Sequence, residues 1–447
     1  MLGLAHVSSG GGVGGTVLIS EERVSMPTSA PLVQEILRVT EVRIRTPRLN
    51  CIDLLRGIVM VLMTLDHVRN FFSGARFSPE DLAHTTGPLF FTRFITHFCA
   101  PAFFLLAGTG AYFSRAQGKS VAQVSRFLWT RGLWLILLDW TVMAVGWTFV
   151  WPFWASNVLC ALGCSMVVMA FLIHLPVRWV GALGAGIILT HDLLDPLKPA
   201  ALGKLAPLYL ILHGWGSFRV DSNGYSFFVL YSVIPWVGVM AIGYALGALL
   251  CQENWRKRVL LVGVALTTMF LILRIFHLYG NGLSNPGVWS AGPMGPWKVQ
   301  ATLTLTMIAF FDTLKYPPSL QFLLMTLGPC LILLAGLDKI NAESRAARIL
   351  LVFGRVPLFY YALHIYIIHV LAVLVAIVFH QHYHWLLHGA TMMGYPPTRY
   401  GHGLPYGHGL PFIYAMWTVV VVMLYFPCTW FANIKQERQD CWWLRYL

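Results

Sequence analysis

Charged residues are scarce in this sequence. Only 11% of its 447 residues are Asp, Glu, Lys or Arg, whereas soluble domains carry about 25%. Hydrophobic residues make up 57%, and the mean hydropathy is +0.66. A water-soluble globular protein of this size is therefore excluded. Because long apolar runs recur along almost the whole chain, we predict one all-α, polytopic transmembrane helical bundle rather than the three domains that length alone suggests.

Acidic residues are the rarer of the two charge types. The chain has 18 Asp and Glu against 31 Lys and Arg, which gives a net charge of +13. In a soluble protein this excess would suggest nucleic-acid binding. In a membrane protein it usually lies in cytoplasmic loops. We therefore expect a lipid bilayer and no nucleic acid as partner.

The eight cysteines do not form the pattern of a disulfide framework. Seven of them fall in or beside apolar runs, where a thiol behaves as a small hydrophobic group. Cys160 and Cys164 share a helix face, but two thiols without further ligands make a poor metal site. We expect packing roles for these cysteines.

The first 47 residues have no long apolar run. They are polar and rich in glycine, and we predict that 1–47 form a disordered segment. A basic stretch followed by an unbroken apolar core is missing there, so we expect no cleavable signal peptide.

Ten apolar stretches reach or approach the roughly 20 residues that cross a bilayer. They are residues 50–72, 89–114, 124–149, 154–175, 177–194, 227–250, 257–278, 318–336, 348–378 and 411–432. Ten crossings leave both termini on one side, where the connecting segments hold 19 Lys and Arg against 8 in the opposite loops. The positive-inside rule then makes both termini cytoplasmic. We assign 48–434 to the membrane domain and 435–447 to a cytoplasmic tail.

Two of the predicted outward loops have unusual compositions. Residues 279–300 contain Trp289 and Trp297, which suit either sugar binding or an ordinary interfacial aromatic belt. The last outward loop is rich in histidine and repeats the hexapeptide 400–405 as 406–411. Because these histidines lack helical spacing and acidic neighbours, a local duplication in a tolerant loop is favoured over metal binding, and we expect no metal.

The first span carries a polar stripe. Arg56 and His67 are eleven residues apart, which on a helix is about three turns plus 20°, so they share a face roughly 16 Å apart. The same face holds Asp53, Met60, Met63 and Asn70, with Asp66 beside His67. Such a stripe is costly against lipid, which favours a protein interior or a water-filled cavity. The alternative is that Arg56 snorkels to headgroups and His67 ends the helix.

Further ionisable groups lie in later spans. Arg93 and His97 form an i,i+4 pair near the depth of His67, and Asp139 in the third span requires a partner. His364 and His369 differ by about 140° around their helix, so at most one faces a cavity, with His369 nearer the outer side. The run Ala107 to Gly110 suits either helix packing or a ligand groove.

These residues resemble a known family. The segment from Arg48 to Asn70 is similar to the opening signature of bacterial members of the heparan-alpha-glucosaminide N-acetyltransferase catalytic-domain family, within the wider transmembrane acyltransferases. Those acyltransferases have an Arg and a His separated by ten residues, the spacing of Arg56 and His67. Further similar segments are Phe90 to Arg93, His97 to Pro101, Leu106 to Thr109, Arg131 to Trp134, Lys315 to Leu320, Met325 to Pro329 and Trp442 to Leu444. The resemblance extends over about residues 48–447.

The resemblance implies acyl transfer, typically of acetyl from cytoplasmic acetyl-CoA to an acceptor on the far side. The lysosomal member acetylates a terminal glucosamine amine, and its catalytic histidine lies in the loop that here contains His84. We prefer His67 as catalytic residue, with His84 second. For a bacterial protein the resemblance implies the inner membrane and an envelope acceptor, which could be an amino sugar, a sugar hydroxyl, peptidoglycan or a lipid headgroup.

The chemistry of the stripe agrees with acyl transfer. A thioester donor needs no metal, and His67 could deprotonate the acceptor or carry the acetyl group. Asp66, Arg93 and His97 complete the candidate catalytic set, with Arg93 or His97 stabilising the oxyanion. Arg56 suits the donor's phosphates, and Met60 and Met63 its pantetheine arm. The remaining candidate substrate-binding residues are Asp53, Asn70, Trp289, Trp297, Lys315, Tyr316 and His369.

Two other interpretations stay open. A secondary transporter could use the stripe as a proton or substrate path, although the chain shows no internal repeat beyond the hexapeptide. A catalytically inactive scaffold is the second, and the intact pair of Arg56 and His67 argues against it. Whether the chain forms a homo-oligomer also stays open.

Overall fold

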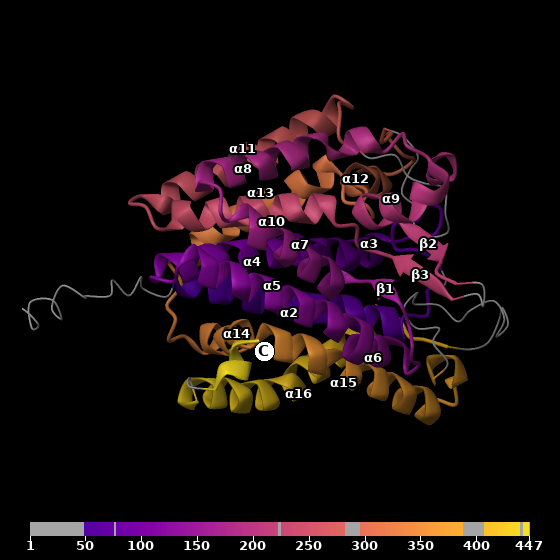
Figure 1. Cartoon of the computed structure of the whole chain (residues 1–447). Helices are drawn as coiled ribbons and strands as arrows, with labels where there is room; N and C mark the ends of the chain where they lie inside the picture. The colour runs from indigo at the N-terminus through magenta and orange to yellow at the C-terminus, as the bar shows by residue number, and fades with distance from the viewer. Residues whose placement is uncertain are drawn as a thin grey trace, which may run out of the picture. The chain divides into compact units, whose positions relative to one another are not determined.

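A computed structural model describes residues 49–75, 77–221, 225–281, 296–387, 406–438 and 441–446. The described chain is mostly helical (Figure 1). The α-helices are α2 (Asn50–Phe72), α3 (Gly87–Phe94), α4 (Cys99–Ala116), α5 (Val121–Leu138), α6 (Ala144–Thr148), α7 (Val158–Leu172), α8 (Val177–Thr190), α9 (Ala206–Leu212), α10 (Ile234–Leu250), α11 (Trp255–Ile275), α12 (Leu303–Phe311), α13 (Leu320–Leu337), α14 (Arg345–Arg355), α15 (Pro357–Val378) and α16 (Leu410–Glu437). Short helical turns are η1 (Ile95–Phe98), η2 (Asp139–Met143, a π-turn), η3 (His191–Leu194), η4 (Pro199–Leu205), η5 (His384–Leu387) and η8 (Trp442–Arg445).

The prediction of a helical membrane protein is confirmed. Within the described ranges, seven helical segments are long and apolar enough to cross a membrane: Gly87–Ala116, Val121–Thr148, Val177–Leu194, Trp255–Ile275, Leu320–Leu337, Pro357–Val378 and Leu410–Glu437. The other three predicted spans are also helical. The helix α2 has the length but carries four charged residues, and α7 and α10 have only 15 and 17 residues. The predicted disordered segment 1–47 lies outside the described residues.

The predicted span 348–378 is divided in two. A break at Val356 separates α14 from α15, because Pro357 can begin a helix but cannot continue one. The membrane-crossing part is therefore α15 alone, and α14 packs across α2. The stretch 298–316 contains only the nine-residue helix α12.

A small sheet was not predicted. Strands β1 (Ala155–Ser156), β2 (Gly216–Arg219) and β3 (Ser226–Val229) form a three-stranded sheet in the order β1-β3-β2. The strand β3 pairs in parallel with β1 and antiparallel with β2. Strands this short carry almost no periodicity, so their sequence resembles a loop. The sheet joins the two loops 150–156 and 195–226 at one end of the helices (Figure 1).

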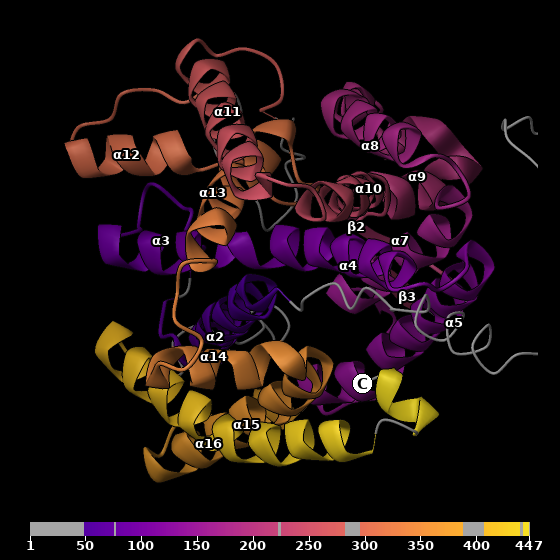
Figure 2. The same cartoon turned by 90° about the vertical axis from the view of Figure 1, so that its left-hand side faces the viewer.

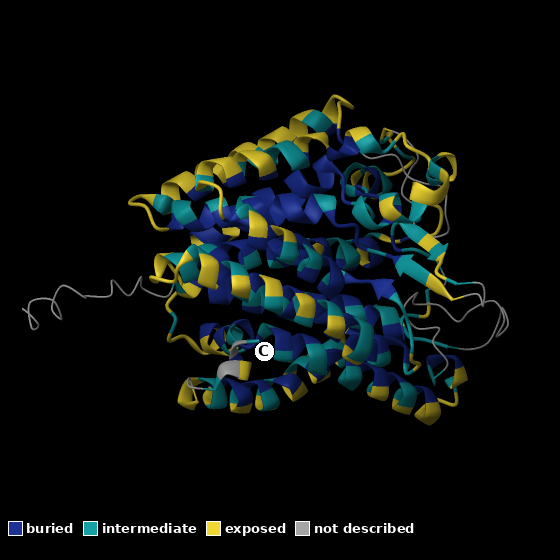
Figure 3. Ribbon diagram, in the orientation of Figure 1, coloured by how far each residue is buried: buried dark blue, intermediate teal, exposed yellow. Residues whose placement is uncertain are grey.

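The helix α2 lies at the centre of the packing. It contacts α4 and α13 on one side and α14, α15 and α16 on the other (Figures 1 and 2). A Cβ atom on Gly57 would collide with the Leu350 carbonyl oxygen, and one on Gly354 with the Asp53 carbonyl oxygen. These two glycines therefore allow the backbones of α2 and α14 to touch. Most of α2 is buried, whereas α11 and α16 expose broad outer faces (Figure 3).

Candidate active site

Two cavities approach each other along α2. The first, which we name the His67 cavity, has a volume of about 240 Å³ and is lined by the C-terminal half of α2, including Asp66, His67 and Asn70. The second, named the Arg56 cavity, has a volume of about 340 Å³ and is lined by Arg56 and Met60. Val158 and Tyr361 line both cavities. The predicted stripe of α2 therefore borders two spaces that share these two lining residues, and we name this shared wall the junction.

The imidazole of His67 is held by a second histidine. Its Nδ1 lies 2.6 Å from Nε2 of His364 on α15, and Nδ1 of His364 lies 2.5 Å from the carbonyl oxygen of Tyr361. Because a carbonyl only accepts, Nδ1 of His364 carries the hydrogen. A neutral His364 then accepts at Nε2, and His67 donates from Nδ1. This arrangement leaves the lone pair of His67 on Nε2, where it can accept a proton as a general base does.

A chain of ion pairs surrounds the His67 cavity. Asp66 accepts from Arg69 at 3.1 Å and also pairs with Arg93. Arg93 donates from Nε to Glu80 at 3.0 Å, and His97 lies 3.6 Å from the same Glu80 oxygen. Burial raises the pKa of Glu80, but Arg93, His97 and Ser78 together outweigh it and hold the pKa well below its usual range. Glu80 thus fastens the loop after α2 onto α3.

The segment after α12 supplies the facing wall. Asp312, Lys315 and Tyr316 all line the His67 cavity. Burial, with a smaller contribution from the charge of Glu80, raises the pKa of Asp312 to about 8. Arg274 fixes this segment because it donates to the carbonyl oxygens of Phe310, Ala309 and Asp312. In the described part of the chain, no group of three or more His, Cys, Asp or Glu side chains is placed to hold a metal.

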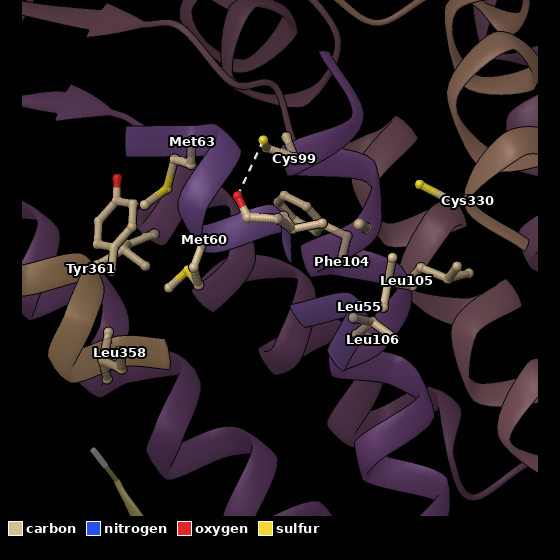
Figure 4. Close-up of a cluster of buried hydrophobic side chains, with 14 of the residues drawn as sticks. Leu55, Met60, Met63, Cys99, Phe104, Leu105, Leu106, Cys330, Leu358 and Tyr361 are labelled. Atoms are coloured by element: carbon tan, nitrogen blue, oxygen red, sulfur yellow. Dashed lines mark hydrogen bonds between the residues drawn. The ribbon is translucent and has the colours of Figure 1, made fainter. Parts of the chain in front are cut away.

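Cations gather around the Arg56 cavity. Its lining contains Arg56, Arg131, Arg355 and Lys435, and among the described residues no acidic side chain lines it. Asp53, which accepts from Arg56 at 3.0 Å, lies beside the cavity. Deeper in, the wall becomes apolar: Met60 lines it, and Met63 packs within the buried core nearby (Figure 4). A polyanion with an apolar arm fits this distribution of charge.

The structure places the other predicted residues as follows. Asn70, Lys315 and Tyr316 line the His67 cavity with Arg93 and His97. The His84 side chain is 63% exposed, pairs with Asp81 at 2.7 Å and lies outside the lining of both cavities.

Three further candidates lie elsewhere. His369 is buried between the carbonyl oxygens of Gly146 and Leu386, at 2.9 Å from each, and lines neither cavity. Trp297 donates to the Arg274 carbonyl oxygen, also away from both cavities. Trp289 lies outside the described residues.

Several residues at the site were not selected from the sequence. His364 carried a signal, since it is an ionisable residue within an apolar span, but its helix alone does not show which neighbour it meets. Glu80 lies in a loop with ordinary composition. Val158 and Tyr361 look like any other apolar or aromatic residue of a span, so their position at the junction could only come from the packing.

The comparison with protein families agrees with this geometry. Residues 48–289, more than half of the chain, match the family model described as heparan-alpha-glucosaminide N-acetyltransferase, catalytic. No curated protein matches the chain. The matched region contains α2, the loop with Glu80 and His84, and the N-terminus of α7. The chain therefore belongs to the heparan-alpha-glucosaminide N-acetyltransferase catalytic family, a family of membrane acetyltransferases.

Proposed function

We propose that the protein takes an acetyl group from acetyl-CoA in the Arg56 cavity and transfers it to an amine or hydroxyl in the His67 cavity. The observation that carries this proposal is that Val158 and Tyr361 line both cavities. A donor and an acceptor that enter from opposite ends of α2 can meet there without either crossing the whole protein.

The Arg56 cavity suits the donor. Coenzyme A carries phosphates at one end and a thioester at the end of a long, largely apolar arm. Arg131 and Arg355 can pair with phosphates, and Arg56 is held in place by Asp53 and by the Gly354 carbonyl oxygen at 3.1 Å. The arm then extends along the Met60 side of the cavity toward the junction.

The His67 cavity suits the acceptor and the proton transfer. The lone pair on Nε2 of His67 takes a proton from the acceptor amine or hydroxyl as that group attacks the thioester carbonyl carbon. The new C–N or C–O bond forms, the C–S bond breaks, and His67 returns the proton to the leaving thiolate. An alternative order, in which His67 first accepts the acetyl group on Nε2, uses the same atoms.

We also propose the orientation. The excess of Lys and Arg lies on the side of the termini. Arg131, Arg355 and Lys435 line the Arg56 cavity at this same end. By the positive-inside rule this end is cytoplasmic, where acetyl-CoA is made available to the protein. The acceptor is then an envelope glycan or headgroup outside a bacterial inner membrane.

The test is transfer of labelled acetyl from acetyl-CoA to the glycans and lipids of membrane vesicles that contain the protein. We expect His67→Ala to reduce transfer by about 10²- to 10⁴-fold, the usual contribution of a general base. His84→Ala is the matched control and is expected to keep most of the activity. Loss of transfer in the His84 variant alone would move the catalytic role to the loop. Solute uptake into proteoliposomes without any acetyl transfer would instead favour the transporter.

A further inference from the structure

The junction between the two cavities lies at the start of α7. Val158, which lines both cavities, is the first residue of this helix, and Asn157 before it lines the His67 cavity. If the proposed acetyl transfer takes place, the thioester carbonyl must reach this junction. Negative charge then develops on the carbonyl oxygen and requires hydrogen-bond donors.

The N-terminus of α7 has donors available. The Asp139 carboxylate accepts from the backbone amides of Asn157 and Cys160, at 3.1 and 3.0 Å. The two amides between them, on Val158 and Leu159, have no hydrogen-bond partner among the described residues. Asp139 thus fixes the flanking amides and leaves the two central ones for another acceptor.

The side chain of Asn157 points to the same conclusion. It is only 5% exposed and lines the His67 cavity; its Oδ1 is buried without a hydrogen-bond partner, and no described residue accepts a hydrogen bond from its Nδ2. A buried amide without a partner is costly in a protein that binds nothing there. Because the amide carries two N–H donors, it can complete a site for an oxyanion.

Tyr361 supplies a further donor from the opposite wall. A tyrosine hydroxyl carries one O–H donor, and the Tyr361 hydroxyl donates to no other described residue. Its hydrogen is therefore available to a group bound in either cavity. Tyr361 lines both cavities, and Figure 4 shows its ring extending from α15 beside Met60 and Met63 of α2.

The donors expected from the sequence lie on the acceptor side of the site. Arg93 pairs with Asp66 and Glu80, whereas His97 lies 3.6 Å from Glu80 and has no hydrogen-bond partner among the described residues. Neither Arg93 nor His97 lines the Arg56 cavity from which the donor would come. Their charges organise the acceptor side of the site rather than the junction.

We propose that the α7 amides of Val158 and Leu159, the Asn157 side chain and the Tyr361 hydroxyl form the oxyanion-binding element of the transfer reaction. This inference rests on the proposed function. When the acceptor nitrogen or oxygen bonds to the carbonyl carbon, the carbonyl electron pair moves onto oxygen and is held by these donors. It returns to re-form the carbonyl as the C–S bond breaks, and the thiolate takes the acceptor's proton through His67.

The experiment uses acetyl-CoA labelled with ¹³C at the thioester carbonyl, bound to the purified full-length protein. Infrared difference spectra report hydrogen bonding to this carbonyl without requiring an identified acceptor. In the wild type the carbonyl band is expected below its position for free acetyl-CoA. Tyr361→Phe and Asn157→Ala are expected to return the band toward the free value. In the vesicle assay each should reduce kcat by about 10²-fold, with little change in KM for acetyl-CoA.

Tyr360→Phe is the matched control. In the wild type the Tyr360 hydroxyl is hydrogen-bonded to the Thr64 hydroxyl at 2.6 Å, and Tyr360 lines neither cavity. If Tyr361→Phe does not fold, Asn157→Ala carries the test. Variants that bind acetyl-CoA with the wild-type band would overturn the oxyanion site and leave the proposed function standing. A wild-type protein that fails to bind acetyl-CoA would overturn both.

Discussion

His67 and His364 are 297 positions apart in the chain, yet their ring nitrogens lie 2.6 Å apart. The pair joins α2 to α15. The carbonyl oxygen of Tyr361, 2.5 Å from Nδ1 of His364, fixes the hydrogen of His364 on that nitrogen. Trp147 packs edge-on against His67, with ring centroids 4.8 Å apart. His67 is therefore restricted in orientation and in tautomer by groups that do not themselves need to touch a substrate.

Replacing His364 tests this positioning role. His364→Ala removes the acceptor for the Nδ1 hydrogen of His67, so the lone pair is no longer fixed on Nε2. We expect acetyl transfer to fall roughly 10- to 100-fold, part of the general-base contribution of about 10²- to 10⁴-fold. The pH dependence of kcat/KM should also change, because loss of the hydrogen-bond partner changes the pKa of His67. His364→Gln should restore part of the rate, since an amide oxygen can accept the same hydrogen.

His369 on the same helix is the control for this experiment. Its two ring nitrogens contact backbone carbonyl oxygens of Gly146 and Leu386 rather than His67. His369→Gln is expected to lower the melting temperature without moving the pH profile. An unchanged profile in His364→Ala together with a normal rate would show that His67 does not depend on its partner.

The sequence was sufficient for the general architecture because its signals are local. Helical periodicity predicted that Arg56 and His67 share one face of α2. The free-energy cost of placing charge against lipid predicted that this face points into the protein. The pairing of Arg93 with Asp66 and the partner of Asp139 could not be foreseen, because both depend on how separate helices pack. Asp139 was expected to need a partner, and it meets the α7 amides rather than a cation.

Other residues show where local signals mislead. His369 has the same chemistry as His364 and lies five residues further along α15, yet only His364 reaches His67. The three strands β1, β2 and β3 have too few residues to show a period of two. Val158 carries no chemical signal in its side chain at all. Its role in the proposed reaction lies in its backbone amide and in the position at which α7 begins.

The cations of the Arg56 cavity are expected to recognise the phosphates of the donor. Arg131→Ala should raise KM for acetyl-CoA by about 10- to 100-fold, since a hydrogen bond to a charged group contributes about 1.5–3 kcal/mol. S-acetylpantetheine lacks the nucleotide phosphates, so its KM should change little. Arg126, five residues earlier on α5 and exposed, is the control. Equal losses with both donors would mean that Arg131 supports the helix packing rather than the phosphates.

Stability is expected to fall with rising pH because of Asp312. Burial and the nearby Glu80 raise its pKa in the folded protein to about 8, whereas an unfolded Asp has a pKa of about 3.9. Between these values only the folded state holds the proton, so the stabilising effect is complete below pH 4 and is lost as pH rises to about 8. Asp312→Asn does not titrate. Its melting temperature should exceed that of the wild type by an amount that grows from pH 5 to about pH 8 and then levels off.

The same comparison at low pH serves as the internal control for Asp312. Near pH 4 both side chains are neutral in the folded state, so the two melting temperatures should be close. Parallel curves for the two proteins from pH 5 to pH 9 would show that the Asp312 carboxyl ionises freely in the folded state.

Two glycines of α4 offer a last test, because one packs against a neighbouring helix and the other lines a cavity. A Cβ on Gly108 would collide with the Met240 carbonyl oxygen of α10, whereas a Cβ on Gly110 would meet no described atom within 4 Å. Gly110 instead lines the Arg56 cavity. Gly108→Ala should therefore destabilise the protein by about 1–3 kcal/mol through overpacking, measured by thermal unfolding in detergent. Gly110→Ala should be neutral or slightly stabilising, because alanine favours the helix by about 0.5–1 kcal/mol. Equal stability of the two variants would mean that α4 and α10 can separate without cost, and the close helix contact would then have no role in holding the Arg56 cavity in shape.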